Sequence, residues 1–418
     1  MNIDIAVLSI AILIGLYVAA NIGANDLANA MGTSVGSRSL TLRQAVLVSI
    51  IANALGAVLA GGQVTTTISK GMIEPALLAG EPNKLMLGMF AALISAGLWV
   101  HLATWLGLPV STTHAIVGAV VGFGILGVGA GAVGWAKIIT IAISWVTSPA
   151  AGAVIAGGIF YLTEKKVMRA GDPYAAAIHY SPALIFLVIL VLILSMIFKG
   201  LKNLPMELGF FQTVLLATPC AALAGLLGRR WLRSRLRAYC ELGPEEQTYS
   251  PVECLFARLQ VLTACYVAFA HGANDVANAV GPLATIFSVV KTKSVSLQVE
   301  VPFWMLLGGG IAVGGGLWAF GTRVMETIGK DITQITPIRG FCVQFGAATT
   351  ILICSRLGLP VSTTHVMVGA VVGVGVMRGM GTLDLRILKN IGLSWVVTMP
   401  FTILLAMVLY KLLTLFLL

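Results

Sequence analysis

Long apolar stretches follow one another along almost the whole chain, separated by short polar segments. Most are close to the 20 or so residues that an α-helix needs to cross about 30 Å of hydrocarbon. None shows the ten-residue units of alternating polarity that are typical of a membrane β-barrel. The last stretch is long enough to hold more than one segment. The stretches are residues 5–20, 45–61, 85–106, 138–162, 182–198, 210–227, 255–270, 303–320, 341–357 and 385–418.

The composition excludes a soluble protein. Of 418 residues, 58% are hydrophobic and only 10% are charged, whereas a soluble chain has about 25% charged residues. We therefore predict an all-α polytopic membrane protein with about 10–12 transmembrane segments. The first apolar stretch has no basic residue before it and runs directly into a polar motif, which does not fit a cleavable signal peptide.

The net charge of +10 comes from basic residues between the apolar stretches, so it does not indicate nucleic-acid binding. The densest group has five arginines within residues 229–237. We predict that residues 229–251 are a cytoplasmic loop with short helical character, following the positive-inside rule. Binding of anionic lipid is the alternative for the arginines. This assignment puts the N-terminus outside the cytoplasmic membrane. The loop with Lys291 and Lys293 does not fit the charge pattern of inverted repeats.

Two polar motifs each occur twice. GANDLANA at 23–30 is matched by GANDVANA at 272–279, and GLPVSTTH occurs without change at 107–114 and at 358–365. The distance from the first motif to the second is 84 residues in one half and 86 in the other. A Ser-Trp pair then follows each second motif at nearly equal distance. Three landmarks in the same order indicate an internal duplication.

The duplication divides the chain into three parts. Residues 1–165 form repeat one, residues 258–418 form repeat two, and residues 166–257 hold connecting transmembrane segments and the basic loop. Corresponding loops of the repeats differ in charge, which indicates two repeats of inverted topology. Polar motifs duplicated within an apolar chain are typical of a membrane transport site.

The order of residues in GLPVSTTH predicts an anion site. Pro109 and Pro360 are placed where a helix begins, so the following hydroxyls lie near free backbone N–H groups at the positive end of the helix. A single copy would indicate no more than a capped helix, but two identical copies favour a site. The hydroxyl residues are Ser111, Thr112, Thr113, Ser362, Thr363 and Thr364.

The residues after each triplet predict a short helix. His114 and His365 end the motifs, and each is either a hydrogen-bonded group behind the site or a proton carrier. The glycine-rich runs 117–122 and 368–373 are too short for a full crossing and favour re-entrant helices. Their glycines, four residues apart, allow close helix packing and would suit a homodimer.

The GAND motifs predict a cation site. Asp26 and Asp275 lie in apolar surroundings, where a carboxylate costs roughly 2.5–3.5 kcal/mol, and no Lys or Arg is near them in sequence. With the oxygens of Asn25 and Asn274, and of carbonyls exposed if the glycines unwind the helix, they suit a hard cation such as Na⁺. An interhelical hydrogen-bond network and a protonated Asp that carries H⁺ are the alternatives. Asn29 and Asn278 follow four residues after each first asparagine, on the same helix face.

With these motifs the chain resembles the inorganic phosphate transporter (PiT) family of symporters. The resemblance implies inverted repeats and transport of phosphate with Na⁺, or with H⁺ in some bacterial members. It places phosphate between the two Ser-Thr-Thr triplets and the cation on Asn25, Asp26, Asn274 and Asp275. A third motif of animal members, Val-x-Glu-Thr-Ile, is kept at Glu326 but has Thr66 in the first copy. A role that needs both glutamates therefore does not carry over.

We thus expect a secondary-active symporter that couples inorganic phosphate to Na⁺. An H⁺-coupled phosphate permease or a sulfate permease of the same fold is the alternative. A passive anion channel would have no use for paired carboxylates inside the membrane. An enzyme is not expected, because no GxSxG or HExxH motif is present.

Overall fold

The computed structural model describes residues 3–70, 72–200, 210–240, 249–295, 299–321, 324–325, 336–379 and 385–417. Nearly all of these residues lie in helices, which confirms the all-helical prediction. Ten helices of the described chain are long and apolar enough to cross a membrane. They are α1 (Ile3–Ile22), α3 (Leu42–Ala60), α5 (Pro82–Trp105), α7 (Trp135–Thr163), α8 (Pro173–Gly200), α9 (Phe210–Cys240), α10 (Pro251–Thr292), α11 (Phe303–Phe320), α13 (Pro337–Arg356) and α15 (Leu385–Leu417).

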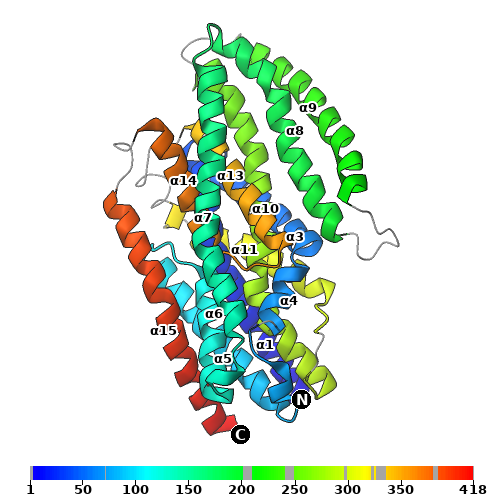
Figure 1. Ribbon diagram of the computed structural model, residues 1–418, viewed down its shortest axis with the longest axis vertical. Helices are drawn as coiled ribbons and strands as arrows, with labels where there is room; N and C mark the ends of the chain where they lie inside the picture. Colours follow the sequence, from blue (N-terminus) through cyan, green and yellow to red (C-terminus); the bar gives the residue numbers. More distant parts are fainter. Residues whose placement is uncertain are drawn as a thin grey trace.

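Shorter elements lie between the long helices. The short α-helices are α2 (Ala28–Gly36), α4 (Gly62–Lys70), α6 (Thr112–Phe123) and α14 (Thr363–Arg378). Turns of π-helix are η1 (Gly23–Leu27), η3 (Gly124–Val128) and η5 (Glu164–Met168), and turns of 3₁₀-helix are η2 (Pro75–Leu78) and η4 (Ala130–Ala132). Figure 1 shows both chain ends at the lower end of the bundle, with α8 and α9 side by side at its upper right.

Two expectations about the elements were wrong. The last apolar stretch is the single helix α15, which continues through Pro400. Of the predicted loop with short helical character, the arginine run at 229–237 is entirely helical, because α9 continues to Cys240, and residues 241–248 lie outside the described residues. Arginine is a good helix former, and Leu232 and Leu236, four residues apart, are buried and hold this part of the helix against the protein.

The two short helices α6 and α14 pack against helices of the other half of the chain: α6 against α15, and α14 against α7. The contacts are close because glycines face backbone. A Cβ atom added to Gly122 would lie 2.4 Å from the carbonyl oxygen of Ile403, and one added to Gly373 would lie 2.1 Å from that of Ala153. These glycine faces are therefore used inside the chain and are not available to a second copy, so the predicted homodimer would need other surfaces.

The two GAND motifs have different backbones. The first lies in the π-helical turn η1 and the start of α2, whereas the second lies within the unbroken helix α10. The expectation that glycines would unwind both copies is therefore wrong for the second. All side chains of the two motifs that the structure describes are buried, and both motifs contact the starts of α6 and α14.

Candidate functional site

The helices α6 and α14 begin in the same way. Ser111 is the N-cap of α6, and its Oγ accepts a hydrogen bond from the backbone N–H of His114 at 3.1 Å. Ser362 caps α14 and accepts from the N–H of His365 at 3.2 Å. Serine is favoured at this position because its oxygen satisfies an N–H without an intrahelical partner. Pro109 and Pro360 lie two residues before these caps. Each helix therefore begins three residues after its proline, and not at the proline as predicted.

The two helix starts lie against each other, although about 250 residues separate them in sequence. The hydroxyl of Thr113 donates to the carbonyl oxygen of Val361 at 3.0 Å, and the hydroxyl oxygen of Thr364 lies 3.2 Å from the carbonyl oxygen of Val110. All six predicted hydroxyl residues are buried. The structure therefore brings both Ser-Thr-Thr triplets into one cluster, where the positive ends of two helices meet.

The first asparagine of each GAND motif fixes the loop before its own triplet. The side chain of Asn25 donates to the carbonyl oxygen of Leu108 at 3.0 Å and accepts from the backbone N–H of Val110 at 3.0 Å. Asn274 makes the same pair of contacts in the second repeat, at 3.1 and 3.2 Å. Each amide oxygen keeps one lone pair beyond its bond to the backbone.

Each aspartate accepts hydrogen bonds from threonines of the triplets. Asp26 accepts through Oδ2 from the hydroxyl of Thr112, and through Oδ1 from that of Thr364 at 2.6 Å. Asp275 accepts through Oδ2 from Thr363 at 2.5 Å. Asp26 thus joins hydroxyls of both repeats, whereas Asp275 contacts a hydroxyl of its own repeat.

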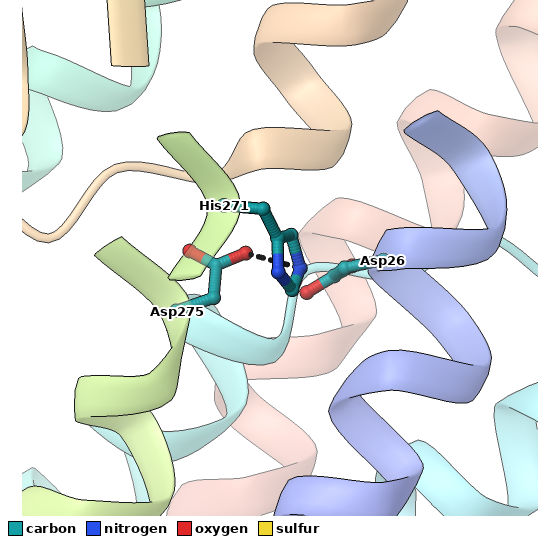
Figure 2. A group of neighbouring side chains, drawn as sticks. All are labelled: Asp26, His271 and Asp275. Carbon is teal, nitrogen blue, oxygen red and sulfur yellow. Dashed lines mark ion pairs between the residues drawn. The ribbon is translucent and has the colours of Figure 1, made fainter. Parts of the chain in front are cut away.

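A histidine lies between the two carboxylates. Figure 2 shows His271 with Asp26 and Asp275, and their ligand atoms lie within 4.8 Å of one another. The Nε2 atom of His271 is 3.1 Å from Oδ2 of Asp275. Its Nδ1 is 2.8 Å from the amide oxygen of Asn53, whose amide nitrogen donates to the carbonyl oxygen of Ser49. Nδ1 must therefore donate to Asn53, so in the neutral imidazole the lone pair of Nε2 faces the carboxylates.

The cluster has acceptor atoms to spare. In the described part of the protein, Oδ1 of Asp275 and Oδ1 of Asn278 are buried and have no hydrogen-bond partner. No lysine or arginine forms an ion pair with either aspartate there. Buried acceptors without partners are costly, and a small cation among these oxygens would satisfy them. The residues present thus fit a cation site.

Asn278 connects the carboxylates to the hydroxyls. Its amide nitrogen donates to the hydroxyl oxygens of Thr112 and Thr113, each at 3.2 Å. These threonines belong to the first repeat and Asn278 to the second, so the contact crosses between the halves. Asn29, the matching residue of repeat one, lies in α2, with its side chain outside what the structure describes.

The two histidines that end the triplet motifs lie in an aromatic cluster next to the helix starts. Their rings are in edge-on contact, with centroids 4.5 Å apart. The ring of His114 lies 3.7 Å from that of Trp145, and the ring of His365 lies 3.5 Å from that of Trp395. The indole N–H of Trp145 donates to the carbonyl oxygen of Pro360 at 3.2 Å, again across the halves.

The first copy of the third motif is a part of the predicted site that the structure does not bring to the cluster. Thr66 lies on the exposed side of α4, where its hydroxyl donates to the carbonyl oxygen of Gly62 at 2.8 Å. Its neighbour Thr67, which the sequence did not point to, contacts the carbonyl oxygen of Gly358 at 2.8 Å. Glu326 lies outside the described residues.

His271 and Asn53 were not predicted from the sequence. His271 directly precedes GANDVANA and stands four residues before Asp275, which places both on one helix face. That spacing could have pointed to it. Asn53 is a lone amide in an apolar stretch, and its partner comes from a helix more than 200 residues away, so nothing in the sequence indicated the contact.

Comparison with known proteins gives a consistent match. Residues 22–406 match the phosphate transporter family. The chain is 41% identical over 406 residues to a protein of Pyrococcus abyssi named "Putative phosphate permease", covering 97% of this chain and 98% of that protein. It is 38% identical to "Inorganic phosphate transporter 2-1, chloroplastic" of Arabidopsis thaliana, covering 93% of this chain and 69% of that protein.

A solved structure named "The sodium-dependent phosphate transporter" is 41% identical, with a TM-score of 0.90. The alignment covers 99% of this chain and 100% of that one. Sequence and fold thus agree over nearly the full length. The chain therefore belongs to the inorganic phosphate transporter (PiT) family, and it is an integral membrane transporter of phosphate and not an enzyme.

Proposed function

We propose that the protein is a Na⁺-coupled phosphate symporter of the cell membrane. Na⁺ binds between Asp26 and Asp275, and phosphate binds between the two Ser-Thr-Thr triplets. The likeness to a structure named as sodium-dependent supports the coupling ion. Two buried carboxylates without a lysine or arginine partner in the described residues support a cation at this place.

One observation carries the coupling mechanism: the same threonine hydroxyls serve both ions. The hydroxyls of Thr112, Thr363 and Thr364 now donate to the aspartates. When Na⁺ takes the carboxylate lone pairs, these hydroxyls are free to turn and donate to phosphate oxygens. Binding of the cation thus prepares the donors for the anion.

Charge gives a second reason for the order of binding. A phosphate oxygen about 5 Å from a carboxylate is repelled by roughly 3 kcal/mol per charge pair at an effective dielectric constant of 20. Na⁺ between Asp26 and Asp275 removes most of this repulsion. The free acceptor Oδ1 of Asn278 beside the triplets would accept a bond from protonated phosphate, which sulfate cannot donate.

The proposal includes the movement of two inverted repeats, residues 1–165 and 258–418, joined by residues 166–257. The lengths of α6 and α14, 12 and 16 residues, are below the 20 or so needed to span and support re-entrant helices. Each packs on a helix of the opposite repeat, so a relative movement of the repeats would change the surroundings of both triplets. We infer alternating access by this movement.

The direct test is uptake of radiolabelled phosphate into proteoliposomes that contain the purified protein. A Na⁺ gradient is compared with a K⁺ gradient and with a pH gradient. Uphill accumulation with Na⁺ alone is expected. Uptake without dependence on Na⁺ would disprove the coupling.

The alternative is coupling to H⁺. One specific observation favours it, namely the imidazole of His271 next to both carboxylates, because an imidazole can hold a proton where Na⁺ would otherwise bind. Accumulation driven by the pH gradient alone would support this alternative. Competition by sulfate but not by unlabelled phosphate would instead indicate a sulfate permease.

A further inference from the structure

A basic pocket lies far from the central site, at the upper end of the molecule in Figure 1, where α7 passes through η5 into α8. It is open and has a volume of about 740 Å³. Lys166 of η5 and three arginines of α9 line it, together with the first turns of α8. The arginines, Arg229, Arg233 and Arg237, are spaced by four and therefore lie on one face of the helix.

Among the described residues, the positive charge of this pocket exceeds the negative charge. Asp172 is the one acidic residue among the described residues of the lining, and its Oδ1 already accepts the backbone N–H of Ala175 at 3.0 Å. Within the described residues, none of the four basic side chains forms an ion pair. The α8 N-terminus adds its positive end to the same space. The pocket is therefore suited to an anion.

Close helix packing fixes the position of the pocket. A Cβ atom added to Gly225 would lie 2.7 Å from the carbonyl oxygen of Pro182, and one added to Gly228 would lie 2.5 Å from the side chain of Ile185. The backbones of α8 and α9 thus meet just before Arg229. From Arg229 toward the C-terminal end of α9, the arginine face and the first turns of α8 line the two sides of the pocket.

The surface beside the pocket changes from apolar to basic within one or two turns. Leu223, Leu226 and Leu227 on α9 are 58–62% exposed, and the arginines follow at once. Trp231, with 51% of its surface exposed, stands at this boundary, as tryptophan does at membrane surfaces. The pocket therefore lies at the depth of lipid headgroups, with an apolar helix surface below it for acyl chains.

We propose that this pocket binds the phosphate group of an anionic phospholipid. The guanidinium groups of Arg229 and Arg233 hold the phosphate oxygens in bidentate hydrogen bonds, Lys166 adds charge, and the acyl chains lie along the exposed leucines of α9. A bound lipid would join the ends of α7, α8 and α9. The inference is independent of the coupling ion and of the central site.

The test is native mass spectrometry of the full-length protein, titrated with phosphatidylglycerol, phosphatidylcholine or inorganic phosphate. Wild-type protein is expected to bind phosphatidylglycerol in preference to phosphatidylcholine. The variant R229Q/R233Q is expected to lose about 150-fold in affinity, equivalent to about 1.5 kcal/mol for each guanidinium group whose hydrogen bonding to the phosphate is lost. The control R230Q/R235Q removes the same charge from the same helix, at positions outside the pocket lining, and is expected to bind as wild type does.

Three outcomes would overturn the proposal. Equal losses in both double variants would mean general attraction to a basic helix, and equal binding of phosphatidylcholine would mean that the pocket does not select anions. Displacement of phosphatidylglycerol by millimolar inorganic phosphate would mean that the pocket takes free phosphate. If R229Q/R233Q does not fold, R229K/R233K keeps the charge and loses the bidentate geometry, and a loss of about fivefold relative to R230K/R235K is expected.

Discussion

The hydroxyls of Thr112, Thr363 and Thr364 connect the binding of the two ions. In the structure they donate to Asp26 and Asp275, and in the proposed transport cycle they donate to phosphate. A hydroxyl can make this exchange by rotating one bond. The coupling therefore needs no large rearrangement at the residues that bind the ions.

Replacing Asp275 by Asn tests this exchange. The amide keeps the size of the side chain and an acceptor for Thr363, but it removes one negative charge from the cation site. We expect an intact fold and Na⁺-dependent phosphate uptake reduced about 100-fold, equivalent to about 3 kcal/mol of lost cation binding. Thr66→Ala, on the exposed side of α4, serves as the control. Normal uptake with unchanged Na⁺ dependence in Asp275→Asn would exclude this carboxylate from coupling.

His271 gives a second prediction at this scale. His271→Ile places in repeat two the residue that repeat one has at the same position, Ile22, and removes the nitrogen beside the carboxylates. His271→Gln keeps a polar atom in this position. We expect the isoleucine variant to raise the Na⁺ concentration for half-maximal uptake about tenfold, and the glutamine variant to have a smaller effect. Equal values in wild type and both variants would show that the imidazole does not contribute to cation binding.

The site residues that occur in both halves could be predicted from the sequence. The site residues that occur in one half could not. The triplets, the asparagines and the aspartates were found because repetition marks them. His271 and Asn53 make the surroundings of Asp275 different from those of Asp26, where Ile22 stands in place of the histidine. A comparison of the two halves identifies residues that occur in both. It cannot identify a functional residue such as His271, which occurs in one half alone.

At the scale of the helices, hydropathy predicted each span but not where the helices end. Apolar length decides whether a helix can cross the bilayer, so all ten stretches correspond to long helices. Helix ends depend on capping and tertiary contacts, and the burial of Leu232 and Leu236 extends α9 into a charged segment. The same extension carries the arginine face that lines the basic pocket.

The close contact between α14 and α7 can be tested by adding a single methyl group, with a substitution of glycine by alanine. Gly373→Ala would place a Cβ atom 2.1 Å from the carbonyl oxygen of Ala153, so the two helices must separate. We expect a loss of about 1–3 kcal/mol in stability, seen as a lower midpoint of thermal unfolding in detergent, together with reduced uptake. Gly158→Ala on α7 is the control, since its added Cβ would contact nothing within 4 Å. Similar melting of both variants would contradict the tight contact.

Over the whole molecule the two halves share the same motifs, but the hydrogen bonds that these motifs form differ. The hydroxyl of Thr364 donates to Asp26 of the other half, whereas in the described part of the chain Thr113 donates to the backbone of Val361 and to no carboxylate. The cation site is thus supported unequally by the two repeats. Equal motifs therefore do not imply equal roles.

This inequality predicts different effects of the same substitution. Thr364→Val should weaken phosphate affinity but strengthen Na⁺ affinity about fivefold, because Asp26 loses a hydrogen bond that Na⁺ must otherwise displace. Thr113→Val should weaken phosphate affinity with less than about twofold change in Na⁺ affinity. The measurement is phosphate uptake over a range of Na⁺ and of phosphate concentrations. A matching change of Na⁺ affinity in both variants would show that the site is functionally symmetric.

The reciprocal contacts of Thr113 with Val361 and of Thr364 with Val110 also bear on the history of the gene. Each GLPVSTTH segment packs against the other, so a substitution in one copy alters the surroundings of both. After a duplication, drift in either copy would be opposed by its twin. The GAND copies bond chiefly to their own half through Asn25 and Asn274, and they differ at Leu27 and Val276. Mutual contact thus gives a physical reason for two identical eight-residue segments in one chain.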